Sequence, residues 1–260
     1  MKFLFIVQGE GRGHFTQAIT LEEMLLRNGH EVVEVLVGKS STRTLPGFFN
    51  RSIHAPVKRF ISPNFLPTAD NKRANLTKSF AYNLLRLPEY LRSMYYINQR
   101  IRETGAEVVI NFYELLTGLT YALFRPSVPY ICVGHQYLFL HRDFEFPDKN
   151  SCQLWMLRFF TRMTALRSSK KLALSFLEME QDDMNQIVTV PPLIRQEVTA
   201  IRPEKGDYIH GYMVNSGFAD SVESFHAKHP EVPLTFFWDR SDAEEVTRID
   251  ETLSFHQIDD

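Results

Sequence analysis

Apolar and polar stretches alternate along the first part of the chain in a way that predicts alternating strands and helices. Short, almost unbroken apolar runs, typical of buried parallel strands, occur at 2–8, 30–38, 54–62, 106–112, 128–134 and 170–176. Longer segments with apolar residues at helical spacing lie between them, at 13–29, 76–105, 114–124 and 151–169. The pattern predicts an α/β domain with a doubly wound, Rossmann-like parallel sheet of six or seven strands.

The pattern is interrupted at 188–207, where three prolines and mixed charge are typical of a connection between domains. Beyond it, a strand, a helix and a strand are predicted at 208–215, 218–229 and 232–239. A doubly wound domain normally needs more than about 100 residues, so this second one is expected to be incomplete. The expected division is a first Rossmann-like domain, a linker and an incomplete second Rossmann-like domain, at 1–195, 196–206 and 207–260.

Composition narrows the class of protein. An apolar fraction of 44% supports a globular core, and the two cysteines, Cys132 and Cys152, form neither a disulfide framework nor a metal motif. No uncharged apolar run is long enough to span a membrane, so we expect a cytoplasmic protein. Residues 1–200 carry a net charge of +6 and residues 201–260 a net charge of −8. The positive part is too weakly charged to indicate nucleic acid, but it suits an anionic substrate or lipid surface, or is ordinary surface variation.

The segment VQGEGRGHFTQA, residues 7–18, joins the first strand to the first helix. A glycine-rich turn at this place lets the backbone approach an anion, whose charge is favoured by the helix N-terminus. The dinucleotide-binding motif G-x-G-x-x-G is incomplete, because His14 stands at the third glycine position. The second strand also lacks the acidic residue that holds a cofactor ribose. A phosphate-bearing ligand is therefore expected, and a nicotinamide cofactor fits poorly.

The stretch GEGRGHFTQAITLEEMLLRNGHEV resembles the amino-terminal motif of two-domain glycosyltransferases of the GT-B fold. The similarity is to family 28, which includes the enzyme that completes lipid II, and to related macrolide and glycolipid transferases. It rests on a Gly-His pair closing the loop and on Gly-His-x-Val opening the second strand, at Gly13, His14, Gly29, His30 and Val32. Weaker similarity continues through VVINFYE, VPYICVGHQ and VPPLIR.

The resemblance implies that the amino-terminal domain binds the acceptor and the carboxy-terminal domain binds a nucleotide sugar. The loop residues expected to contact the acceptor are Gly9, Gly11, Arg12 and Gly13. The turn after the strand at 208–215 would lie beside the donor, through Asn215, Ser216 and Gly217. A plain connecting turn is the other interpretation of those three residues.

His14 is the candidate catalytic base, because imidazole titrates near neutral pH and can take a proton from an acceptor hydroxyl. It could instead position the substrate or simply begin a helix. Glu114, just after a predicted strand, is the candidate carboxylate that orients His14, or else a solvated helix-start residue. Relatives often have Asp two positions earlier, where this chain has Phe112. His135 and Gln136 end the next strand and are candidate acceptor contacts, or ordinary loop residues.

The helix at 151–169 mixes aromatic and basic residues, as in helices that lie on anionic lipid. The residues expected to face the membrane are Trp155, Arg158, Phe159 and Arg162. The alternative is a packed helix whose arginines point into water.

The sequence thus predicts an inverting glycosyltransferase with no metal and no cofactor, using a nucleotide sugar such as a UDP sugar and a glycan or lipid-linked acceptor. It would lie in the cytoplasm or peripherally at the inner face of the membrane. The alternatives are a binding protein that has lost turnover and, more remotely, an oxidoreductase. The second glycine-rich turn and the donor-binding acid of the family are not found before Asp260. We therefore expect the 260-residue chain to bind acceptor but to transfer no sugar.

Overall fold

The computed structural model describes residues 1–39, 45–64, 76–146, 151–213, 216–240 and 243–258. The chain divides into two compact units. Unit 1 comprises Met1–Asn64 and Asn83–Ala200, and unit 2 comprises Phe65–Tyr82 and Ile201–Asp260.

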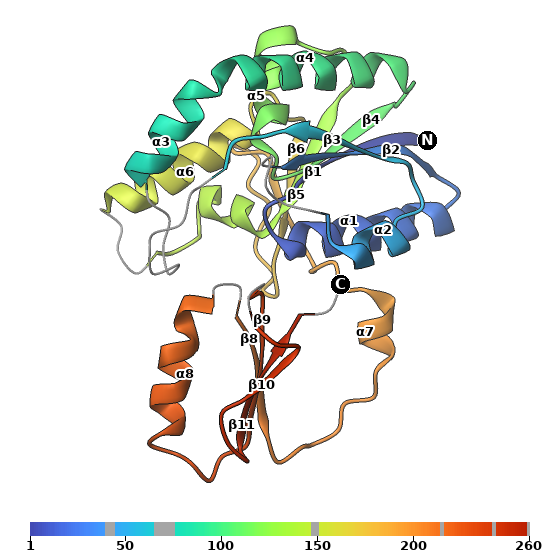
Figure 1. Ribbon diagram of the computed structural model, residues 1–260. Helices are drawn as coiled ribbons and strands as arrows, with labels where there is room; N and C mark the ends of the chain where they lie inside the picture. The colour runs from blue at the N-terminus through green and yellow to red at the C-terminus, as the bar shows by residue number, and fades with distance from the viewer. Residues whose placement is uncertain (40–44, 65–75, 147–150, 214–215, 241–242, 259–260) are drawn as a thin grey trace. The chain divides into compact units, whose positions relative to one another are not determined.

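Seven strands of the described part of unit 1 form one parallel sheet, in the order β3-β2-β1-β4-β5-β6-β7 (Figure 1). The strands are β1 (Lys2–Gln8), β2 (Glu31–Lys39), β3 (Val57–Ile61), β4 (Val108–Phe112), β5 (Tyr130–Gly134), β6 (Lys170–Leu174) and β7 (Ile187–Val190). The predicted doubly wound parallel sheet is confirmed. The seventh strand lies within the expected first domain, 1–195, and overlaps the segment 188–207, whose prolines and mixed charge indicated a connection between domains.

Helices α1 (Arg12–Arg27), α2 (Gly47–Ser52), α4 (Leu87–Glu103), α5 (Leu115–Phe124) and α6 (Cys152–Thr164) pack against the two faces of this sheet. The described part of the chain also contains α3 (Leu76–Leu85), α7 (Gln196–Ala200) and a 3-10 helix, η1 (His135–Leu140). The helical segment predicted at 76–105 is interrupted at Pro88, as expected, because proline fits only the first turn of a helix, here that of α4.

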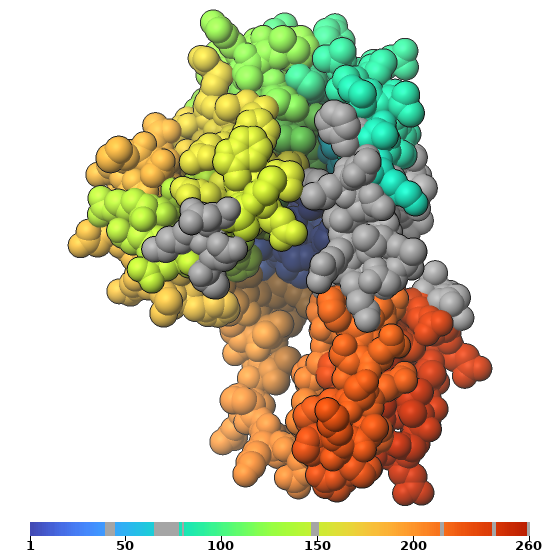
Figure 2. Space-filling model, turned by 90° about the vertical axis from the view of Figure 1, so that its left-hand side faces the viewer, coloured from blue at the N-terminus to red at the C-terminus, as the bar shows by residue number. Residues whose placement is uncertain are grey.

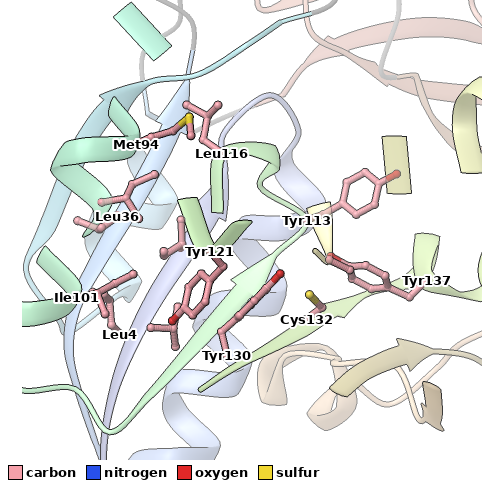
Figure 3. Packing of buried hydrophobic residues seen from close by; sticks show 14 of the residues in the cluster. Leu4, Leu36, Met94, Ile101, Tyr113, Leu116, Tyr121, Tyr130, Cys132 and Tyr137 are labelled. Carbon is pink, nitrogen blue, oxygen red and sulfur yellow. The ribbon is translucent and has the colours of Figure 1, made fainter. Parts of the chain in front are cut away.

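Two apolar layers enclose the sheet of unit 1. One layer packs α1 and α2 against it through residues such as Phe15, Ile19 and Phe49. The other packs α4 and α5 against the opposite face and includes Tyr90 and Tyr121 (Figures 1 and 3). Because the strands are parallel, the segments that follow β1, β4 and β5 all lie at the carboxyl edge of the sheet.

Unit 2 contains a smaller sheet, in the order β10-β11-β9-β8. Its described elements are β8 (Ile209–Met213), a 3-10 turn η2 (Ser216–Phe218), α8 (Ala219–His226), β9 (Leu234–Trp238), β10 (Val246–Arg248) and β11 (Leu253–Gln257). Strands β8, β9 and β11 are parallel, and β10 is antiparallel to β11. The sequence predicted only the first two strands, because β10 is short and lies in a polar, charged segment.

Candidate functional site

Eight residues at the carboxyl edge of the unit 1 sheet line a pocket of about 280 Å³. They come from the end of β1, the loop after it, the first turns of α1 and the start of η1. The lining residues are Gln8, Glu10, Gly11, Gly13, His14, Gln17, His135 and Gln136. The pocket therefore unites the glycine-rich loop with the residues that follow β5, as ligand sites in open parallel sheets generally do.

The glycines of the loop serve different purposes. Gly9 donates its N–H to the carbonyl of Gly38, with an N–O distance of 2.7 Å. A Cβ atom on Gly9 would lie 2.7 Å from that same oxygen, so only glycine fits there. Gly11 is the N-cap of α1 and offers no side-chain cap, while Gly11 and Gly13 give main chain to the pocket wall. The N-terminus of α1 is thus left open to an anion or to a polar group.

His14 is buried in the first turn of α1 and lines the pocket. Its Nδ1 lies 3.4 Å from Oε1 of Gln17, one turn later. With the amide oxygen of Gln17 towards the ring, this contact is a hydrogen bond when Nδ1 of neutral His14 carries the proton, and Nε2 then keeps its lone pair. Burial lowers the pKa of His14 to about 4, the hydrogen bond with Gln17 opposes this shift, and the nearby charge of His135 adds to it. His14 is therefore neutral at pH 7.

His135 and Gln136 form the opposite side of the pocket. The ring of His135 is held by the carbonyl oxygen of Leu174, which lies 3.1 Å from its Nδ1. The side-chain oxygen Oε1 of Gln136 is buried and has no hydrogen-bond partner among the described residues. A buried acceptor without a donor is costly, so a hydroxyl or an N–H group that reached this oxygen would be stabilising.

Glu114 does not pair with His14 in the described structure. Its Oε1 accepts hydrogen bonds from the hydroxyl of Ser62 at 2.6 Å and from the N–H of Leu116 at 3.0 Å. Glu114 is the helix-start residue of α5, as the alternative interpretation held, but it is fully buried rather than solvated. Burial raises its pKa to about 7. The side chain in contact with Nδ1 of His14 is that of Gln17 rather than Glu114.

Two further predicted acceptor residues lie outside the pocket lining. Gly9 packs against the end of β2, as described above. The guanidinium of Arg12 lies 5.7 Å from the centre of the Phe48 ring, a cation–π distance. Gly9 and Arg12 thus support the loop without lining the pocket.

Of the predicted donor residues, Asn215 is outside the described part of the chain, and Ser216 and Gly217 form the turn that precedes α8.

Helix α6 exposes the aromatic residues that the sequence assigned to a membrane. Trp155 is 63% and Phe159 is 49% exposed, and their rings stack with centroids 5.4 Å apart. Arg162 is exposed as well, whereas Arg158 is half-buried and its Nε has no partner among the described side chains. Figure 2 shows α6 in yellow at the surface of unit 1. No helix in the described ranges is long and apolar enough to cross a membrane.

Sequence reasoning missed Gln8, Glu10 and Gln17 in the pocket, and Tyr113 beside it. Gln17 could have been found, since a residue three positions after His14 lies on the same side of a helix. Tyr113 gave no signal, because its position depends on an unusual backbone turn. Within the described segments, no three His, Cys, Asp or Glu residues come together as a metal site would require.

Comparisons with known proteins agree with this architecture. Arabidopsis thaliana UGT89C1 complexed with UDP-L-rhamnose has a TM-score of 0.55 and 14% identity, over 98% of this chain and 69% of that one. S. aureus MnaA with UDP has a TM-score of 0.57 and 12% identity, and the match covers 99% of this chain and 69% of that one. Streptomyces sp. SF2575 glycosyltransferase SsfS6 with thymidine diphosphate has a TM-score of 0.54 and 13% identity, over 99% and 72%. At such identities the similarity concerns the fold, which is of the GT-B type.

A search of curated protein sequences finds no match. The profile of one family, described as Glycosyl transferase family 1, matches residues 1–252 and so almost the whole length of the chain. The chain belongs to this glycosyltransferase family.

Proposed function

We propose that the protein transfers a sugar from a nucleotide sugar to an acceptor hydroxyl bound in the pocket of unit 1, with His14 as the general base. One observation carries the proposal: His14, which is neutral at pH 7, lines one pocket together with Gln136. A bound hydroxyl would place its oxygen near Nε2 of His14. A neighbouring hydroxyl or amide would donate to Gln136.

The reaction proposed is a single displacement. The acceptor oxygen forms a bond to the anomeric carbon while the bond from that carbon to the diphosphate oxygen breaks. The acceptor proton passes to Nε2 of His14, and the electron pair of the broken bond leaves with the diphosphate. One displacement inverts the configuration at the anomeric carbon. The mechanism is proposed to need no metal, because the sequence lacks an Asp-x-Asp motif and helix termini can stabilise a leaving diphosphate.

The low pKa of His14 fits this role in two ways. At neutral pH the imidazole is unprotonated before the reaction, so no proton has to be removed first. A bound diphosphate would bring negative charge and raise the pKa of His14, because a nearby opposite charge favours the protonated ring. A base with a pKa nearer the working pH is more effective in the transition state.

The donor is proposed to be a UDP sugar, since UDP or a UDP sugar is named in several of the similar structures. Ser216 and Gly217, with Asn215, are proposed donor contacts by resemblance. Gly11 and Gly13 offer main-chain groups to the acceptor, with Gly9 and Arg12 supporting the loop.

The acceptor is proposed to be a lipid-linked glycan. Helix α6 supports this class, because Trp155 and Phe159 are exposed beside the exposed cation Arg162. Aromatic side chains next to cations favour the headgroup region of an anionic membrane. The protein would then act peripherally at the cytoplasmic face of a membrane.

Release of nucleotide diphosphate tests the proposal. The protein is incubated with a panel of UDP and dTDP sugars and with glycan, phenol and lipid-phosphate acceptors. Unlike the expectation of no transfer drawn from the sequence alone, the proposal predicts release that depends on the acceptor and falls about 100-fold in His14→Gln. His229→Gln, which changes an exposed histidine of unit 2, is the control and should behave as the unaltered protein.

Equal release by the His14→Gln variant would exclude His14 as the base. Binding of a nucleotide sugar with no release under any condition would contradict the transfer reaction and favour the alternative, a binding protein without turnover.

A further inference from the structure

Tyr113 adopts a backbone conformation that is unusual for a residue with a large side chain. It follows the last residue of β4, Phe112, and has a φ of 62°. This left-handed region is readily accessible to glycine but costs conformational energy for tyrosine. Such strain persists only where surrounding contacts hold it, and it is often found at functional sites. The contacts of Tyr113 therefore indicate what the strained turn achieves.

Residues of α6 and η1 hold the Tyr113 side chain from one side. Its hydroxyl lies 2.8 Å from Oγ1 of Thr161, which is itself fully buried. Its ring meets that of Tyr137 edge to face, with centroids 5.7 Å apart, and that of Phe160 at 5.6 Å. Figure 3 shows Tyr113 and Tyr137 close together at one end of the buried cluster. Three groups thus fix the orientation of one ring.

The ring of Tyr113 also stacks with that of His14. The two ring centroids are 5.9 Å apart and the planes are only 19° from parallel, an offset stacked arrangement. His14 belongs to α1, on the opposite face of the sheet from α6. Tyr113 therefore reaches across the carboxyl edge of the sheet and connects the two helical layers at the pocket.

We propose that Tyr113 is the positioning residue of His14: its ring, fixed by Thr161 and Phe160, sets the plane of the imidazole and shields one of its faces from water. Gln17 holds Nδ1 within the imidazole plane, and Tyr113 restricts the ring from above that plane. The two contacts engage Nδ1 and the face of the ring, and Nε2 is the atom proposed to meet a ligand in the pocket that His14 lines. This inference deepens the proposed function and rests on it for its catalytic meaning.

A purely structural role of Tyr113 predicts a different result when the residue is replaced. A tyrosine that merely fills the core would affect stability when replaced, but it would not alter the titration of His14. The shielding by Tyr113 contributes to the burial that lowers the pKa of His14. The pKa of His14 is therefore a readout that separates positioning from packing, and it needs neither donor nor acceptor.

The test is an NMR titration of the His14 side chain in the full chain and in four variants. In Tyr113→Leu, loss of the ring admits water, and the pKa of His14 should rise by about one unit or more towards its ordinary value. In Tyr113→Phe and Thr161→Val the ring remains, so the pKa should stay within about half a unit. Tyr121→Leu removes a buried tyrosine of the same cluster that has a similar hydrogen bond, and it should leave the pKa unchanged.

An unchanged pKa in folded Tyr113→Leu would overturn the proposal. If that variant does not fold, the proposal is tested in the unaltered protein. Nuclear Overhauser effects between the ring protons of Tyr113 and His14 are expected there, and their absence would overturn the proposal. Failure of the proposed function is seen separately, as unchanged nucleotide release in His14→Gln.

Discussion

The side-chain oxygen of Gln17 lies 3.4 Å from Nδ1 of His14, one turn apart on α1. In many acid–base pairs a carboxylate occupies the place of this amide. The amide can hydrogen-bond with the ring without adding a negative charge. It therefore leaves the imidazole neutral, where a carboxylate would favour the imidazolium.

Replacing Gln17 by Glu tests this electrostatic difference. A carboxylate at the same distance should raise the pKa of His14 by one to three units, on the order expected for an opposite charge within about 4–6 Å. Gln17→Leu removes the hydrogen bond that opposes the downward shift, so the pKa should fall further. Side-chain NMR of both variants measures the effect. Equal pKa values in the two variants would show that Gln17 does not contact His14 in solution.

Glu114 should make unit 1 less stable as the pH rises. Its pKa is about 7 in the folded protein and near 4.5 in the unfolded chain, so the folded state binds an extra proton between these values. The stability that it contributes is complete below about pH 4.5 and is lost as the pH rises through about 7, with a span on the order of 3 kcal/mol.

Glu114→Gln keeps the side-chain shape and removes the titration. Its stability relative to the unaltered protein, from urea unfolding, should therefore increase between pH 5 and pH 8. Glu31→Gln changes an exposed carboxylate of the same unit and serves as the control. A constant difference between Glu114→Gln and the unaltered protein across this range would contradict the assignment.

Gly38 should tolerate no side chain. A Cβ atom there would lie 2.3 Å from Oε2 of Glu114 and 2.8 Å from the ring of Phe60. Gly38→Ala should therefore lower the free energy of unfolding by about 1–3 kcal/mol, as overpacking usually does. Gly13→Ala is the matched comparison, because a Cβ on Gly13 meets nothing within 4 Å and alanine favours a helix. Thermal unfolding of both variants measures the difference. An equal loss of stability in Gly38→Ala and Gly13→Ala would contradict the packing described around Gly38.

Asp250 should hold the end of α8 to the strand β11. It lies 2.6 Å from Nε2 of His226, and its Oδ1 accepts from the N–H groups of Thr252 and Leu253. The hydrogen bond from His226 is the main reason that the pKa of Asp250 is lowered. A lowered carboxyl pKa stabilises the fold above the unfolded value, near 3.8, and the benefit is lost as the pH falls below it.

Asp250→Asn should accordingly weaken the hydrogen-exchange protection of the Thr252 and Leu253 amides at pH 7. The stability difference from the unaltered protein, measured by unfolding, should shrink below about pH 4. A difference that persists unchanged at pH 3 would mean that the ionised carboxylate is not responsible.

The sheet of unit 1 could be predicted because its strands are buried on both sides. Runs such as Phe3–Val7 read as apolar without interruption, and the helices between them keep a regular apolar spacing. β10 could not be predicted, since three residues at a sheet edge carry almost no pattern. β7 was missed because the prolines after it, at 191 and 192, dominated the interpretation of the whole segment.

The candidate site was predictable only in part, for a physical reason. The places of His14, His135 and Gln136 follow from the rule that strand ends meet at one edge of a parallel sheet. The partner of each side chain does not follow, because it depends on rotamers and on backbone turns. Glu114 turns away to Ser62, and the left-handed backbone at Tyr113 carries its ring to His14.

The central claim is that His14 presents an unprotonated Nε2 to the pocket at neutral pH. Nitrogen-15 NMR of the labelled imidazole reports both the tautomer and the pKa in one titration. We expect the neutral ring to carry its proton on Nδ1 and to titrate with a pKa of about 4. A proton on Nε2 at pH 7, or a pKa at or above the ordinary value of about 6.5, would contradict the account.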